Sequence, residues 1–248
     1  MSWTLRHGTT TASYVAPFGL ESAMEFVRVV GEQNQRALVG REALVNPGAD
    51  RTAELAINRT QRMIQFINDL QDPLILPLVI LEPFGGAPAE VVEGLGRLVG
   101  ELNVRVQTHT AERTPLPNGT LEMWSQAGLL PPNKFLGYHG LQLGDSELEF
   151  FRQRNLSLAH NPNSNLNFAS GILDVRKVLN MGIRLGLGLD ISGGYSPSIF
   201  NAMRVAIHAS KALSLTMNQT NYRPLTHHEA FYLATMGGAQ GQPTLIRV

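Results

Sequence analysis

The chain contains no cysteine, and this absence limits the chemistry available to it. Disulfides and thiolate ligands are excluded, so any metal site must use His, Asp or Glu side chains. An excess of one charge is also missing, because Lys plus Arg and Asp plus Glu both total 20. Such a balance leaves no surplus positive charge to hold a phosphate backbone or an anionic membrane. We therefore expect neither nucleic acid nor a membrane as a partner.

Long hydrophobic runs are absent as well. The longest apolar stretch, Pro73 to Leu81, is too short to span a bilayer, and the first residues lack the apolar core of a signal peptide. We therefore expect a cytoplasmic protein. The chain does have 248 residues, 43% of them hydrophobic, which is enough for the core of a folded globular enzyme.

Strand-like apolar runs recur along the chain and alternate with helical patterns. Several runs are nearly continuous, as in strands that are covered on both faces of a parallel sheet. Apolar residues at helical spacing lie between them, for example from Met63 to Leu70. This alternation predicts right-handed βαβ units in an open sheet or a barrel. The seven predicted strands are Thr9–Val15, Ala37–Leu44, Leu74–Leu81, Val104–Thr110, Phe135–Leu143, Asn155–His160 and Arg184–Ile191.

A polar, proline-rich segment, Ala111–Pro132, follows the fourth predicted strand. Long loops at this end of a strand belong to the catalytic face of barrels. Loop length alone is weak support for a function. The segment is therefore predicted to be either a lid over the substrate or a plain surface loop.

Four of the predicted strands end in residues that bind metals or move protons. A barrel brings the C-terminal ends of its parallel strands to one rim, so side chains distant in sequence converge there. A metal-dependent hydrolase is therefore the leading hypothesis. The four segments are Gln107-Thr-His-Thr-Ala-Glu112, Tyr138-His139-Gly140, Ala159-His160-Asn-Pro-Asn-Ser-Asn165 and Gly186-Leu-Gly-Leu-Asp190.

His109 and Glu112 can divide the work of a hydrolytic metal site. An imidazole can hold a metal that lowers the pKa of bound water towards about 7, and a carboxylate can relay the water's proton to the leaving group. A His followed three residues later by Glu is common, so an ordinary polar strand end remains an alternative.

The other site residues also have structural alternatives. His139 lies in an apolar strand, where an isolated His is usually a hydrogen-bonded core residue, and His160 precedes a segment typical of turns. Asp190 ends an apolar strand, so its carboxylate needs a metal, a cation or hydrogen bonds. A dinucleotide loop at Gly186 and Gly188 is disfavoured, because the third glycine of that motif is missing.

In order and spacing, these segments resemble the guanine deaminase branch of the metal-dependent amidohydrolases. Gly8-Thr-Thr-Thr-Ala-Ser-Tyr14 is similar to the second barrel strand, and the four segments above are similar to strands five to eight. The resemblance implies a (β/α)8 TIM-like barrel of the α/β class. It also implies zinc-dependent hydrolytic deamination of guanine, a small-molecule purine substrate, to xanthine and ammonia in purine catabolism, and a homodimer.

The same resemblance implies a role for each site residue. His109 would be a zinc ligand, and Glu112 would move protons between water, a ring nitrogen and the leaving amino group. His139 would ligate the zinc or orient its hydroxide, and Asp190 would bind the metal and accept the water's proton. The residues expected on the substrate side are Phe84, His160 and Asn165.

The chain departs from the family pattern in three places. No His-x-His pair, which supplies two zinc ligands from the first strand, precedes Gly8. After the third predicted strand, Phe84 is present but the family's adjacent Arg is missing, together with its donors to the purine. We also expect the small β domain, which the family builds from both termini, to be missing from residues 1–248. We therefore expect residues 1–248 to form one incomplete barrel domain, with strands two to eight, that binds one zinc ion weakly or not at all.

Two other functions remain open on the sequence. One is a non-catalytic binding or interaction module that keeps a remnant of the barrel. The other is a related amidohydrolase whose pocket, altered near Glu82 and Phe84, accepts another aminated or chlorinated ring.

Overall fold

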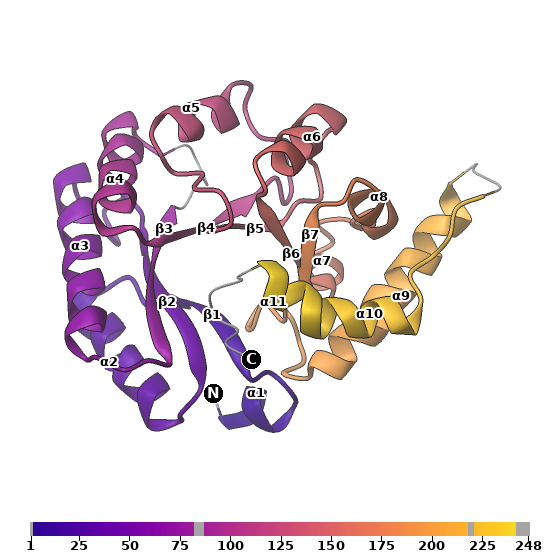
Figure 1. The fold of residues 1–248 in the computed structure, drawn as a ribbon, viewed down its shortest axis with the longest axis horizontal. Coiled ribbons are helices and arrows are strands. Elements are labelled where there is room, and N and C mark those ends of the chain that lie inside the picture. The colour runs from indigo at the N-terminus through magenta and orange to yellow at the C-terminus, as the bar shows by residue number, and fades with distance from the viewer. Residues whose placement is uncertain (1, 82–86, 218–220, 242–248) are drawn as a thin grey trace. The chain divides into compact units, whose positions relative to one another are not determined.

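The computed structural model describes residues 2–81, 87–217 and 221–241. Seven strands follow one another in chain order within one sheet (Figure 1). The strands are β1 (Thr11–Ala16), β2 (Arg36–Ala43), β3 (Ile75–Leu81), β4 (Arg105–Thr110), β5 (Phe135–His139), β6 (Ser157–His160) and β7 (Arg184–Leu187). The helices are α1 (Ser2–Arg6), α2 (Leu20–Glu32), α3 (Ala53–Asp69), α4 (Ala89–Leu102), α5 (Thr120–Gln126), α6 (Asp145–Gln153), α7 (Pro162–Asn167), α8 (Val175–Asn180), α9 (Ile199–Thr216), α10 (His227–Tyr232), the π-helix η1 (Leu233–Gly237) and α11 (Gly238–Gly241).

The predicted α/β architecture is confirmed. All seven predicted strands form, and at least one helix separates each strand from the next along the chain. The registers of β1 with β2, β2 with β3, β3 with β4, β5 with β6 and β6 with β7 are all parallel. None of the helices among the described residues is long and apolar enough to cross a membrane.

The first compact unit consists mainly of Thr10–Thr108 and Gly119–Phe135. Its core forms where α2 and α3 pack on β1, β2 and β3. The buried residues of α2 recur every three or four positions, so one apolar stripe faces the sheet. Val27 and Val30 of this stripe lie in one cluster with Val39 of β2 and Met63 of α3. Burial of each such valine stabilises the fold by roughly 1.5–3 kcal/mol.

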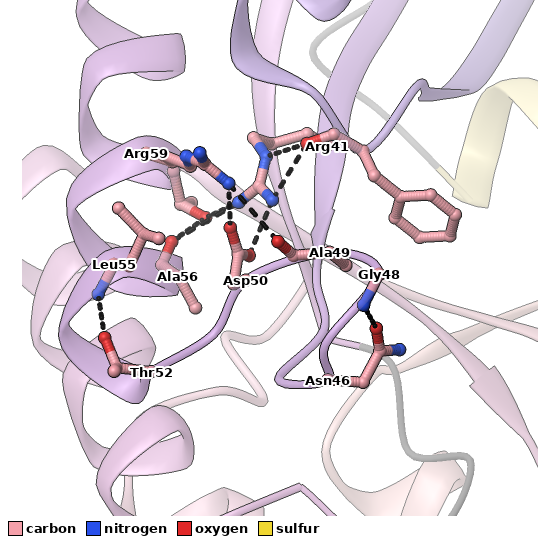
Figure 2. Close-up of polar contacts among 11 residues, drawn as sticks. Arg41, Asn46, Gly48, Ala49, Asp50, Thr52, Leu55, Ala56 and Arg59 are labelled. Carbon is pink, nitrogen blue, oxygen red and sulfur yellow. Dashed lines mark hydrogen bonds and ion pairs between the residues drawn. The ribbon is translucent and has the colours of Figure 1, made fainter.

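A buried ion-pair network fastens the segment after β2 to helix α3 (Figure 2). Arg41, on β2, and Asp50 both have fully buried side chains, and Arg41 Nη2 lies 2.6 Å from Asp50 Oδ2. Arg59, on α3, donates to the other carboxylate oxygen at 2.9 Å. The remaining guanidinium donors of Arg41 bind the carbonyls of Phe18 and Ala56. The charges of Arg41 and Asp50 are therefore compensated by these contacts, and a single substitution would remove that compensation.

The predicted loop Ala111–Pro132 is wrong in part, because it contains α5. Within α5, Leu121 and Trp124 are three residues apart and almost fully buried, so they form an apolar stripe that anchors the helix to the first unit. The four prolines of the segment suggested a loop throughout. They all lie outside the helix, at Pro115, Pro117, Pro131 and Pro132.

The second compact unit consists of Arg6–Thr9, His109–Asn118 and the residues from Leu136 onward. In it, the glycines that end β7 allow backbones to approach closely. A Cβ atom at Gly186 would lie 2.8 Å from the Cα of Gly238, and one at Gly188 would lie 2.0 Å from Asn161 Oδ1. Gly186 thus allows β7 to pack against α11, and Gly188 allows the chain after β7 to pack against Asn161, which follows β6. Both glycines therefore have a packing role, which supports the rejection of a dinucleotide-binding loop at these positions.

Candidate active site

Four of the predicted site residues lie at or just beyond the carboxyl ends of their strands, and all four belong to the second compact unit. His109 is the last residue but one of β4, and Glu112 comes two residues after that strand. His139 is the last residue of β5, and Asp190 lies three residues beyond β7. The structure brings these four side chains together at the carboxyl ends of their strands.

His139 has the central position in this group. Its Nε2 atom lies 3.8 Å from Asp190 Oδ2 and 4.0 Å from Glu112 Oε2. The rings of His139 and His109 are stacked, with centroids 5.5 Å apart and an interplanar angle of 11°. The His139 side chain is 1% exposed, whereas that of Asp190 is 32% exposed. One nitrogen of a buried imidazole thus lies near two carboxylates, one of which reaches solvent.

The backbone turns sharply at these positions. Ala111, His139 and Asp190 have φ values of 47°, 67° and 49°, in the left-handed region that non-glycine residues rarely adopt. Such a conformation costs roughly 1–3 kcal/mol and persists where the surrounding structure enforces it. The predicted strand end at Leu143 is wrong for this reason, since the positive φ of His139 cannot continue an extended strand. The predicted strand end at Ile191 is also wrong, because β7 ends at Leu187, three residues before Asp190.

Asn165, predicted on the substrate side, is hydrogen bonded to a catalytic candidate. Its Oδ1 atom lies 2.7 Å from His139 Nδ1, and both side chains are 1% exposed. Asn165 is carried by α7, whose first residue, Pro162, has the fixed φ that favours a helix start. The oxygen of Asn165 is therefore engaged by His139, while its amide nitrogen has no hydrogen-bond partner among the described residues.

Glu112 has its own partner from the same part of the chain. The hydroxyl of Ser170, three residues beyond α7, donates to Glu112 Oε1 at 2.7 Å. Arg113 approaches the same carboxylate at 4.0 Å, and its guanidinium lies over the ring of Phe168. One carboxylate oxygen of Glu112 is thus held, and the other is directed to His139.

His160 is buried without a hydrogen-bond partner. Both of its ring nitrogens lack a partner among the described residues, as does the hydroxyl of Ser164 on α7. Burial, reinforced by the charge of His139, lowers the pKa of His160 from 6.5 to about 3. His160 is therefore neutral at physiological pH and presents a nitrogen lone pair and an N–H to the interior of the second unit.

We expect this burial to make stability depend on pH. Below about pH 6.5 the unfolded chain protonates His160, whereas the folded chain remains neutral at this position down to about pH 3. The unfolded state then binds more protons, so the free energy of unfolding falls as pH decreases, by up to about 1.4 kcal/mol per pH unit. Urea unfolding of His160→Gln should show a shallower decline between pH 7 and pH 5. The exposed His208→Gln control should keep the wild-type slope.

Three functional candidates carried no signal in the sequence. Ser164 lies in the segment after His160 that was interpreted as a turn, whereas Ser170 and Gly193 received no role from the sequence. A Cβ atom at Gly193 would lie 2.7 Å from Ser164 Oγ and 3.1 Å from Asp190 Oδ2, so only glycine leaves this space open. Their importance depends on which strand ends become neighbours, which local sequence does not specify. The predicted substrate contact Phe84 lies outside the described residues.

The residues available for a metal are His109, His139 and Asp190. A catalytic zinc usually takes three protein ligands, with donor atoms about 2.0–2.3 Å from the ion. The described part of the chain contains no group of three His, Asp or Glu side chains that could hold a metal. His139 Nε2 and Asp190 Oδ2, 3.8 Å apart, form the start of such a group. These residues therefore do not complete a zinc site by themselves.

Comparisons with known proteins show what the chain is similar to. The guanine deaminase of Dictyostelium discoideum is 34% identical over 249 residues, covering 95% of this chain and 55% of that protein. The guanine deaminase of Homo sapiens is 33% identical over 252 residues, covering 96% and 55%. The crystal structure of guanine deaminase from C. acetobutylicum, with guanine bound in its active site, superposes with a TM-score of 0.88 at 26% identity, covering 97% of this chain and 60% of that one.

The chain thus spans a little over half the length of these relatives. The profile of the amidohydrolase family matches residues 1–241. That match runs through β1–β7 and through every strand end that bears a candidate catalytic residue. The chain therefore belongs to the amidohydrolase family.

Proposed function

We propose that the chain serves the hydrolytic deamination of guanine to xanthine and ammonia, a step of purine catabolism. The observation that carries this proposal is the grouping of Glu112 and Asp190 near the same nitrogen, Nε2, of the buried His139. Similarity to guanine deaminases from several organisms supports the choice of substrate. A homodimer belongs to the same proposal and can be measured by sedimentation.

The reaction requires two proton carriers with different tasks. Water adds to the ring carbon that bears the amino group, and one carboxylate must accept the water's proton. A second group must carry a proton to the ring nitrogen, then take the remaining O–H proton of the adduct and pass it to the leaving amine. A C–O bond forms, the C–N bond breaks and ammonia departs, and exchange with solvent returns the proton held by the first carboxylate to the second group. We assign the first task to Asp190 and the second to Glu112. General acid–base catalysis of this kind contributes about 10²–10⁴-fold.

The environments of the two carboxylates fit this division. Asp190 is the more exposed, which suits contact with incoming water. Glu112 is 9% exposed, and Ser170 holds one of its carboxylate oxygens in place. A carboxylate held in this way suits a group that serves the ring nitrogen and then the leaving amine of one bound ring. His139, whose Nε2 lies near both carboxylates, can orient the attacking oxygen by a hydrogen bond. This bond gains strength because the ring is removed from water.

Zinc is part of the proposal. When bound by His109 and Asp190, with His139 beside them, it would lower the pKa of a water molecule towards about 7. Since the described residues provide no complete ligand group, the proton transfers above are assigned to side chains of the chain alone.

We expect zinc to bind weakly and activity to depend on added metal. After chelator treatment and desalting, elemental analysis should find well below one zinc ion per chain, because affinity falls when ligands are few. Xanthine formation, followed by ultraviolet absorbance, should rise at least about tenfold when micromolar zinc is added. Tight stoichiometric zinc that survives chelation would contradict the first expectation.

Two variants distinguish the effect of zinc bound at the proposed site from unspecific effects of zinc. His109→Gln should abolish the response to added zinc, because it removes one of the few ligands. His208→Gln, at an exposed position of α9, should retain it. An assay across guanine, cytosine, adenosine and triazines identifies the substrate, and turnover of a ring other than guanine would replace the proposed substrate.

A non-catalytic purine-binding module is the second candidate. The observation that favours it is the lack of a three-ligand metal group in the described ranges. Calorimetry distinguishes the two functions, since guanine binding without xanthine formation at saturating zinc supports the second one. If guanine neither binds nor reacts, both are excluded.

A further inference from the structure

Helix α7 and the turn that follows it make hydrogen bonds to two catalytic candidates, His139 and Glu112. Asn165 contacts His139, and Ser170 donates to Glu112. The segment is itself tied together, because the N–H of Ser170 donates to the carbonyl of Asn165 at 2.8 Å. A shift of α7 would therefore move both contacts. This coupling indicates that the segment positions reactive groups in addition to lining the site.

The contact between Asn165 and His139 determines more than the location of the ring. A neutral imidazole carries its hydrogen on one nitrogen, and the hydrogen bond made by one nitrogen sets the state of the other. Asn165 Oδ1 has no hydrogen to donate, so a bond at 2.7 Å requires a hydrogen on His139 Nδ1. The lone pair of neutral His139 then resides on Nε2.

The carboxylates of Glu112 and Asp190 favour the other tautomer of His139, with the hydrogen on Nε2. Glu112 and Asp190 lie near Nε2 and would attract a hydrogen to that nitrogen. Their oxygens are 4.0 and 3.8 Å away, however, beyond hydrogen-bonding distance, whereas Asn165 is within it. The contact at Nδ1 should therefore dominate as long as Asn165 presents its oxygen.

We propose that Asn165 is a positioning residue that keeps the hydrogen of His139 on Nδ1, and thereby keeps Nε2 turned to Glu112 and Asp190 as an acceptor. Without Asn165, the hydrogen would move to Nε2, and that nitrogen could no longer accept a proton or a metal ion. The catalytic meaning of this inference rests on the proposed deaminase function. Its test needs no turnover.

The test is nitrogen NMR of the full chain with labelled histidine, at a pH of about 8.5 where an ordinary imidazole is neutral. The chain has seven histidines, and the signal of His139 is identified by its loss in His139→Gln. We expect a protonated Nδ1 in the wild type. Asn165→Asp, which keeps an oxygen acceptor, should preserve it. Asn165→Leu, which is of similar size without an acceptor, should shift the hydrogen largely to Nε2.

Two results would overturn the proposal: a wild-type His139 that carries its hydrogen only on Nε2, or an Asn165→Leu spectrum in which Nδ1 remains protonated. Circular dichroism checks that each variant is folded. If Asn165→Leu does not fold, the wild type and Asn165→Asp still decide, because a hydrogen confined to Nε2 in either contradicts the proposal. Xanthine formation, measured separately, tests the proposed function: a protonated Nδ1 without turnover counts against deamination alone.

Discussion

Replacement of Glu112 by Gln is expected to lower kcat for the proposed deamination of guanine by about 10²–10⁴-fold, the usual contribution of a general acid–base group. Glutamine has nearly the same shape and can still accept the hydrogen bond from Ser170, so the site should remain in place. It cannot carry a proton between the ring nitrogen and the leaving amine. The KM for guanine should therefore change little, and steady-state kinetics at saturating zinc measure both constants.

The matched control is Glu122→Gln, which makes the same chemical change on the exposed face of α5. It should leave kcat within about twofold, as expected for a surface substitution away from the site. If Glu112→Gln retains most of the wild-type kcat, Glu112 is not the proton carrier. Equal losses in both variants would point to an effect on solubility or folding.

Replacement of Asp50 by Ala is expected to destabilise the fold by about 3–5 kcal/mol, because it leaves the buried charge of Arg41 without its partner. The loss should be large since Arg41 and Asp50 are both fully buried, and water cannot solvate the remaining guanidinium. Arg59 loses its partner as well, but it is partly exposed and can turn to solvent. Urea unfolding followed by circular dichroism gives the change in free energy.

The control breaks an ion pair on the surface. Asp145 and Lys177 form a close pair in which both side chains are exposed, so Asp145→Ala should cost at most about 1 kcal/mol. In the double variant Arg41→Met with Asp50→Ala, removal of both charges should recover part of the lost stability. A loss no larger for Asp50→Ala than for Asp145→Ala would show that the buried network contributes little.

The strands were predictable because their signal is local. Residues 75–81 read Ile-Leu-Pro-Leu-Val-Ile-Leu, and only a strand covered on both faces accommodates such a run. The helix α5 was missed since its apolar stripe consists of two residues, Leu121 and Trp124, whose burial depends on packing in the first unit. The predicted end of β5 was too late because the backbone of His139 turns left-handed, which its residue type does not indicate. The predicted end of β7 was also too late, at Ile191 instead of Leu187.

The sequence predicted which residues lie in the site, but not which hydrogen bonds join them. His109, Glu112, His139 and Asp190 stood out as polar residues after apolar strands, and the structure brings them together. The bonds of Asn165 and Ser170 to members of that group could not be foreseen, because 26 and 58 residues separate the partners along the chain.

By itself, the sequence determined the α/β class, the order of the seven strands and the amidohydrolase signature, since these follow from patterns over a few neighbouring residues. The tertiary structure decided which atoms meet. It placed Nε2 of His139 near two carboxylates and Nδ1 of the same ring within hydrogen-bonding distance of Asn165. It also buried His160, so that its pKa falls to about 3. Desolvation and hydrogen-bond direction act through space over a few ångströms, so they become defined only when distant segments have packed together.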